Sequence, residues 1–302
     1  MTAVVPDALP DVLAWLVIAS FITTAALERY DRKIARTVGA GAWILFGLFW
    51  GVLFPRFAFE MKSFVEGALT LAAVPLCIYA GYQLYSGRDT LFVLSRAIAA
   101  MGIIYVPFSS IEFLRQWLVE LVSYQTNVVI EALGYDPEFT IAEQNGYHSA
   151  FIFTDETGHT YYTYLVLACT GIGSMSIFGG LIAAVKAPLR RKLKAFTIAV
   201  SIIWVLNVAR NVFIALAFGN QWFQFFVGPI TSLAGYADPG MVSFFIADRV
   251  LSQLLAVVAL VAILWLVLRD LPELLTVIED VAYLVTGNEY DLRRTVRTDG
   301  GR

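Results

Sequence analysis

The chain has 302 residues, of which 59% are hydrophobic and only 15% charged, with a formal net charge of −3. Its mean hydropathy is +0.71. This leaves too little polar surface to solvate a globule of this size and excludes an ordinary water-soluble domain. Several apolar runs are long enough for an α-helix to cross a bilayer, and they lack the alternation of a transmembrane barrel. We therefore predict an all-α, polytopic transmembrane helical bundle, with residues 1–302 forming a single membrane-embedded domain.

Seven apolar segments are predicted to span the membrane. In chain order they are 12–27, 38–54, 67–85, 91–111, 170–185, 195–218 and 244–268. Lys and Arg gather after the first span, between the fifth and sixth spans, and in the C-terminal tail, whereas the alternate connections contain few. The positive-inside rule makes the basic segments cytoplasmic. This predicts a multi-pass plasma-membrane protein with an extracytoplasmic N-terminus and a cytoplasmic tail at 270–302.

The long connection after the fourth span is predicted to be extracytoplasmic. Within it, apolar residues recur at helical spacing from Leu114 to Leu133, which predicts an amphipathic helix along the interface or over the bundle. An extension of the fourth span fits the same pattern. Further on, 147–154 and 159–166 are rich in aromatic and β-branched residues and flank a stretch of turn composition, so we predict a β-hairpin above the membrane.

Cys169 follows this hairpin directly, near the outer N-terminus of the fifth span. The unpaired N–H groups and dipole of a helix N-terminus favour an anion and lower the pKa of a nearby thiol, which would make Cys169 a nucleophile. A lone membrane cysteine can also be a small packing residue, and Cys77 fits that description. Neither cysteine has a second Cys or a His at metal-site spacing, so we expect no metal, and nothing indicates a cofactor.

Two arginines lie in or near the last two spans. Arg210 is eight residues from the end of the sixth span, a depth of about 12 Å. A guanidinium there costs at least ~2.5 kcal/mol, so it should face the protein interior or a wet cavity and have a partner. Asn207 and Asn211 flank it, and the alternative is a snorkelling arginine. Arg249 follows Asp248 near the outer start of the seventh span, where snorkelling or pairing with Asp248 are alternatives.

The predicted topology places Cys169, Arg210 and Arg249 in one leaflet. A thiol with two permanent cations suits acyl transfer, because the cations favour a thiolate and stabilise the oxyanion of a tetrahedral intermediate. Guanidinium groups stay charged and cannot shuttle a proton. His159 is a nearby candidate for the proton of the leaving group, but it fits hairpin surface as well, so this role stays open.

Three motifs resemble the archaeosortase and exosortase family of membrane-embedded cysteine transpeptidases. They are Ala-Cys-Thr-Gly-Ile-Gly-Ser at 168–174, Asn-Val-Ala-Arg-Asn at 207–211 and Ala-Asp-Arg at 247–249. The resemblance implies that Cys169 is the nucleophile and that Arg210 and Arg249 orient and stabilise the acyl centre. Bacterial members look to have a histidine in the third position, so Arg249 puts an imidazole base in doubt.

The same resemblance implies a substrate class. The enzyme would cleave a C-terminal Pro-Gly-Phe sorting signal of secreted surface proteins, such as an S-layer glycoprotein, through a thioester. It would then enable their anchoring to a membrane lipid. The expected partners are therefore the bilayer, client proteins with a C-terminal transmembrane signal, and a lipid acceptor, with no nucleic acid.

Two other functions remain open at this point. One is a cysteine protease that hydrolyses the same signal without lipid transfer. The other is an anion transporter that uses Arg210 and Arg249 as its binding site, although the sequence has no inverted repeat or pair of interrupted helices of the kind that many transporters use. Sensitivity of the activity to loss of Cys169 separates the enzymes from the transporter.

Overall fold

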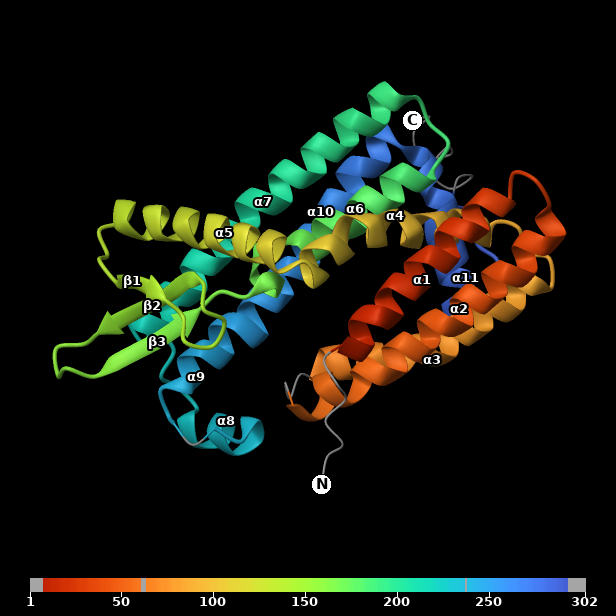
Figure 1. Cartoon of the computed structure of the whole chain (residues 1–302). Helices are drawn as coiled ribbons and strands as arrows, with labels where there is room; N and C mark the ends of the chain where they lie inside the picture. The colour runs from red at the N-terminus through yellow and green to blue at the C-terminus, as the bar shows by residue number, and fades with distance from the viewer. Residues whose placement is uncertain (1–7, 61–63, 237, 293–302) are drawn as a thin grey trace. The chain divides into compact units, whose positions relative to one another are not determined.

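The computed structural model describes residues 8–60, 64–236 and 238–292, and helices dominate this part of the chain (Figure 1). The all-α class is therefore confirmed. Six described helical stretches are long and apolar enough to cross a membrane, and they match six of the seven predicted spans. The predicted fifth span corresponds to the shorter helix α6 (Ile172–Ala184). The chain is a membrane-embedded, multi-pass protein, whereas its orientation in the bilayer stays a prediction.

The chain divides into two compact units. The first comprises Met1–Val106, Ser176–Phe196 and Val267–Arg302, and the second comprises Pro107–Met175 and Thr197–Leu266. Each is described here by itself. The extent of the chain as one functional domain stays a prediction.

Unit 1 is built on three helices that pack side by side, α1 (Ala8–Leu27), α2 (Arg32–Pro55) and α3 (Phe64–Tyr85), as Figure 1 shows. A π-helical turn, Arg56–Glu60, continues α2. Glycines allow close packing: a Cβ on Gly81 would lie 3.0 Å from the carbonyl oxygen of Ala40.

Two further helices complete unit 1. The first part of α4 (Leu91–Ser110) joins the core through Ser95, whose hydroxyl accepts a 3.0 Å hydrogen bond from Trp43. After a 3₁₀ turn at Pro272–Leu274, α11 (Leu275–Thr286) packs against α3. Residues 293–302 of the predicted cytoplasmic tail lie outside the described residues.

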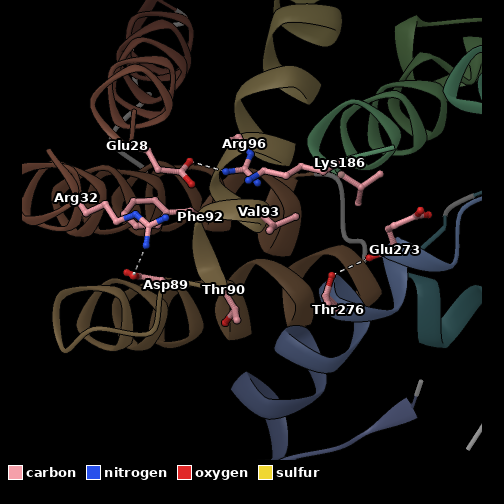
Figure 2. A pocket seen from close by; sticks show the side chains of 11 residues that line it. Glu28, Arg32, Asp89, Thr90, Phe92, Val93, Arg96, Lys186, Glu273 and Thr276 are labelled. Carbon is pink, nitrogen blue, oxygen red and sulfur yellow. Dashed lines mark hydrogen bonds and ion pairs between the residues drawn. The ribbon is translucent and has the colours of Figure 1, made fainter. Parts of the chain in front are cut away.

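Ion pairs tie together one end of the unit 1 helices, the end that is predicted to be cytoplasmic. Arg36 of α2 donates from Nε and Nη2 to both carboxylate oxygens of Asp89, at 2.8 and 3.0 Å. Figure 2 shows a pocket of about 470 Å³ at this end, where Arg96 pairs with Glu28 and Arg32 approaches Asp89. Carboxylates and guanidinium groups therefore largely neutralise one another there.

Unit 2 begins with the last residues of α4 and with α5 (Glu112–Ala132). The two helices are separated at Ile111, whose backbone is extended with φ −96° and ψ 110°. The predicted amphipathic helix is therefore a helix of its own rather than a continuous extension of α4. Its buried face includes Val119, Val122 and Ile130. Helix α7 (Leu189–Gly219) is held to it by a 2.9 Å hydrogen bond from Trp204 Nε1 to Gln125 Oε1.

The predicted β-hairpin is confirmed as β2 (His148–Thr154) and β3 (Thr160–Tyr164), which pair antiparallel. Its turn is closed by Asp155 Oδ1, which accepts hydrogen bonds from the backbone N–H groups of Thr157 and His159. A third strand that was not predicted, β1 (Glu138–Ile141), pairs with β2 and completes an antiparallel sheet in the order β1-β2-β3.

The remaining elements follow the sheet along the chain, and parts of α6, α7 and α10 belong to unit 1. In chain order they are a 3₁₀ turn (Leu167–Thr170), α6, α7, α8 (Val227–Ala234), α9 (Met241–Phe244), a π-helical segment (Phe245–Ser252) and α10 (Gln253–Asp270). Tyr161 of β3 packs edge-on against Phe218 of α7, with ring centroids 5.7 Å apart. This contact fixes the sheet at the C-terminal end of α7, eight residues or about two turns beyond Arg210.

Candidate active site

Cys169 lies in the 3₁₀ turn that leads from the sheet into α6. Its backbone N–H donates a 2.8 Å hydrogen bond to the carbonyl of Val166. Gly171 follows with a φ of +77°, and α6 begins only at Ile172. Cys169 therefore lies three residues before the start of α6, near the N-terminus of that helix, as expected from the sequence.

Two asparagines of α7 hold the backbone of this turn. Asn207 and Asn211, one helical turn apart, both donate from Nδ2 to the carbonyl oxygen of Cys169, at 2.6 and 2.8 Å. A Cβ on Gly171 would lie 3.1 Å from Asn207 Cγ, so a glycine permits both the positive φ and the close approach of α7. The asparagines thus fix the backbone from which the thiol projects, in addition to lending polarity to the wall around Arg210.

The two arginines share one carboxylate. Arg210 of α7 donates from Nη2 to Asp248 Oδ1, and Arg249 Nε lies 3.5 Å from Asp248 Oδ2. All three side chains are partly buried, at 29%, 28% and 15% exposure for Arg210, Arg249 and Asp248. Asp248 is therefore a partner for Arg210, as its depth in the sixth span requires. One carboxylate between two guanidinium groups leaves the cluster with one excess positive charge.

Arg210 also acts on the thiol of Cys169, because its charge and its N–H groups both favour the thiolate. The Cys169 turn lies outside the candidate spans. Burial raises the pKa of the thiol above its ordinary value, and the positive charge of Arg210 acts in the opposite direction. The lowered pKa that a helix N-terminus would give is therefore not found. The resting group is a thiol, and its thiolate is favoured by a backbone hydrogen bond with Val166 and by the charge of Arg210.

The backbone around Asp248 and Arg249 is a π-helix rather than an α-helix. It extends over Phe245–Ser252, and wide turns of this kind are frequent at functional sites. Ser252 Oγ is buried within it and has no hydrogen-bond partner among the described residues. This eight-residue segment contains the third motif and departs from the regular α-helix expected for the seventh span. Hydropathy alone does not reveal it.

Tyr236 is a residue at the cluster that the sequence did not single out. It follows α8, and its ring packs against Phe245 with centroids 6.2 Å apart. Burial raises the pKa of Tyr236, while the charge of Arg249 lowers it and that of Asp248 raises it. The phenol therefore stays protonated at neutral pH and lies within electrostatic reach of both charged groups.

His159 lies in the hairpin turn. It is exposed, its backbone N–H donates to Asp155, and its ring packs against Tyr161 at 4.8 Å. These contacts fit the hairpin-surface interpretation of this residue. Cys77, in contrast, is buried in the core of unit 1. Within the described ranges, no group of three or more His, Cys, Asp or Glu side chains is placed to hold a metal ion.

Comparison with known proteins agrees with the family resemblance. Residues 10–241 match the family model described as transmembrane exosortase (Exosortase_EpsH). Archaeosortase A of Haloferax volcanii is 51% identical over 304 aligned residues, which cover 97% of this chain and all of that protein. Archaeosortase A of Natronomonas pharaonis is 50% identical over 281 residues, which cover 91% of this chain and 89% of that protein. No solved structure matches the chain.

The family match contains two of the three predicted site residues. Cys169 and Arg210 lie inside residues 10–241, whereas Arg249 lies beyond the end of that segment. The match to the family model covers well over half of the chain, and both relatives align over nearly its whole length. The chain belongs to the transmembrane exosortase family.

Proposed function

We propose that this protein is a membrane enzyme that processes C-terminal sorting signals of secreted surface proteins, with Cys169 as its nucleophile. The observation that carries the proposal is the contact of the Cys169 thiol with Arg210, in a cluster where Asp248 neutralises only one of two arginines. Membership of the exosortase family and the two archaeosortase A relatives support it. The expected signal is of the Pro-Gly-Phe type, and an S-layer glycoprotein is a typical client.

In the first half of the proposed reaction, the Cys169 sulfur attacks the carbonyl carbon of the scissile peptide bond. The thiol proton leaves sulfur, and the carbonyl oxygen becomes an oxyanion. When the tetrahedral intermediate collapses, the C–N bond breaks, the amine departs with a proton, and a thioester remains on Cys169. Arg210 and Arg249 supply positive charge to the thiolate and the oxyanion, and one such donor is worth about 2.7–4 kcal/mol in other acyl-transfer enzymes.

In the second half, a hydroxyl or amine of a lipid acceptor attacks the thioester carbon. The C–S bond breaks, the client gains an ester or amide bond to the lipid, and the thiol is regenerated with the acceptor proton. Asn207 and Asn211 act throughout as positioning residues, because their hydrogen bonds fix the carbonyl of Cys169. We place this chemistry at the outer face of the membrane, where the predicted topology puts Cys169.

Substitution of the nucleophile tests the proposal. Cys169→Ala should abolish processing of a client that carries the C-terminal signal, because no thioester can form. Cys77→Ala is the matched control and should retain processing, since that thiol is buried in the core of unit 1. Client mass measured in isolated membranes gives both results. Processing by Cys169→Ala at the rate of the unmodified protein would exclude cysteine catalysis.

The mass of the product decides between lipid transfer and hydrolysis. A client that gains the mass of a membrane lipid at its new C-terminus supports the transpeptidase. A client that ends in a free carboxylate supports a protease that uses the same thioester and transfers it to water. Anion flux through reconstituted protein that is equal in the presence and absence of Cys169 would instead indicate a transporter.

A further inference from the structure

Unit 1 contains an apolar groove that the proposed function does not use. It has a volume of about 520 Å³ and lies between α2, α3, α4 and α11. Trp50 of α2, Leu69, Ala73 and Leu76 of α3, and Leu284 of α11 are among its lining residues. Leu69 is 64% exposed, so the groove opens to the outside of the unit. Around helices of membrane-spanning length, the outside at this level is the hydrocarbon core of the bilayer.

One charged side chain interrupts this apolar lining. Glu66 stands in the first turn of α3, at the first residue of the candidate span 66–85. Its Oε2 atom is buried and has no hydrogen-bond partner among the described residues. A carboxylate oxygen that is removed from water without a donor is costly, so a donor supplied by a ligand would stabilise it. The groove therefore has an unsatisfied acceptor at one end.

The pocket in Figure 2 shows what a satisfied cluster looks like in the same unit. Two of its carboxylates already have arginine partners. Glu28 pairs with Arg96, as Figure 2 shows, and Asp89 pairs with Arg36. Those interactions close the cluster internally and require no ligand. The Glu66 groove differs because its acceptor has no partner within the described part of the chain and the rest of its lining is almost wholly apolar.

The dimensions of the groove fit a lipid that stands upright in the bilayer. Glu66 lies at the end of α3 where headgroups lie, and Leu76 is ten residues further along the helix, about 15 Å away. This distance is about half of a hydrocarbon core of roughly 30 Å. A hydrocarbon chain along α3 would cover the apolar lining, and a headgroup with an N–H or O–H donor would satisfy Glu66.

We propose that this groove binds one membrane lipid, whose hydrocarbon chain packs along α3 and whose amine or hydroxyl headgroup donates a hydrogen bond to Glu66. The bound lipid belongs to the leaflet in which α3 begins. A choline headgroup, which has no N–H or O–H donor, does not meet the requirement of Glu66. The site therefore selects among lipids by their headgroup and is more than a general lipid-facing surface.

Photocrosslinking in nanodiscs tests the proposal with the full-length protein. The discs consist of phosphatidylcholine with a trace of phosphatidylethanolamine that carries a diazirine in its acyl chain. Crosslinks should map to the groove faces of α3 and α11. Unlabelled phosphatidylethanolamine and phosphatidylglycerol should compete with the probe, whereas additional phosphatidylcholine should not. Equal competition by all three lipids, or crosslinks spread evenly over the spans, would overturn the proposal.

Two neighbouring alanines provide a matched pair of variants. Ala73 lines the groove, and Ala72 is exposed on another face of α3. Ala73→Trp should fill the groove and reduce crosslinking by about tenfold or more, whereas Ala72→Trp should leave it unchanged. Equal crosslinking in Ala73→Trp and Ala72→Trp contradicts the site.

Substitution of the carboxylate tests the headgroup contact. Glu66→Gln should weaken competition by the ethanolamine lipid by about tenfold while crosslinking to α3 continues. Unchanged competition in this variant contradicts a contact between the headgroup and Glu66. Lipid capture needs no thioester, so the whole series can be repeated in Cys169→Ala protein, and its result does not depend on the function proposed for Cys169.

Discussion

The two units place arginines next to carboxylates in different proportions. In unit 1, Arg32 and Arg36 share Asp89, but Arg88 contacts two carboxylates, those of Asp280 and Glu289, and Arg96 pairs with Glu28, so the charges balance over the cluster. In unit 2, Arg210 and Arg249 share the single carboxylate of Asp248. A balanced pair holds helix ends together. An unbalanced one, partly buried beside a thiol, leaves positive charge available to a developing anion. We therefore assign the paired arginines of unit 1 to fold stability and propose a catalytic role for Arg210 and Arg249.

The largest expected effect comes from removing one arginine of each kind. Arg210→Gln should reduce the rate of signal processing by about 10²–10³-fold, because it removes the cation in contact with Cys169. Arg96→Gln should retain the rate and lower the thermal stability, because it breaks the pair with Glu28. Client cleavage in proteoliposomes and melting in detergent measure the two quantities. Similar losses of rate in both variants would remove the distinction between the two clusters.

The geometry of the unit 2 cluster is tested by two glycines that lie two residues apart. Gly171→Ala should cost about 1–3 kcal/mol of stability, because φ is +77° at this position and the added Cβ would press on Asn207. Processing should fall about tenfold, because the turn that carries Cys169 shifts. Gly173 lies inside α6 with nothing within 4 Å of a Cβ, so Gly173→Ala should be neutral or stabilising by up to about 1 kcal/mol. Full processing by Gly171→Ala would show that the turn need not be rigid.

The excess positive charge should also be visible in the titration of the thiol. Because burial raises the pKa of Cys169, its alkylation rate should increase with pH and reach its midpoint above the ordinary value of about 8.5. Arg210→Gln should move the midpoint higher still, since it removes the charge that favours the thiolate. The measurement uses the Cys77→Ala background, which leaves Cys169 as the remaining cysteine. A midpoint below the ordinary value, or one that is unaffected by Arg210→Gln, contradicts this account.

The smallest effect is expected in the balanced cluster. The hydrogen bond from Arg36 holds the pKa of Asp89 below its usual value. The pair therefore stabilises the fold fully at pH values above the pKa of about 3.9 that an unfolded Asp has. This stabilisation is lost as the pH falls through the lower pKa of the folded state. Asp89→Asn should therefore be less stable than the unmodified protein at neutral pH and should approach it in acid. The pair is about one-third exposed, which keeps the difference small. Melting temperatures at several pH values measure it.

Much of the fold follows from hydrophobic patterning. Six spans and the β-hairpin were predicted because long apolar runs and clusters of aromatic and β-branched residues are local signals. Strand β1 was missed because four residues, Glu138–Ile141, give too short a pattern. The one-residue break at Ile111 was left undecided, since helical periodicity continues on both sides of it.

The sequence was enough to propose the members of the candidate site, but not the contacts between them. Cys169, Arg210 and Arg249 were selected as chemically unusual residues on one side of the membrane. The bridge from Arg210 to Asp248 joins residues that are 38 positions apart, so only tertiary structure reveals it. For the same reason the sequence could not show that Asn207 and Asn211 bind the carbonyl of Cys169, or that burial outweighs the charge of Arg210 in setting the pKa of the thiol.

The π-helical segment at Phe245–Ser252 has a consequence for angular register. In a regular α-helix, each residue turns the chain by about 100°. Sequence spacing alone then determines which residues further along the helix lie on the same side as a given side chain. The π-helical turns change the angle about the helix axis between Arg249 and the exposed apolar side of α10. That side includes Leu254, Val258 and Val261. Deleting one residue from this segment would rotate Arg249 about the helix axis relative to that side, without altering the composition of either.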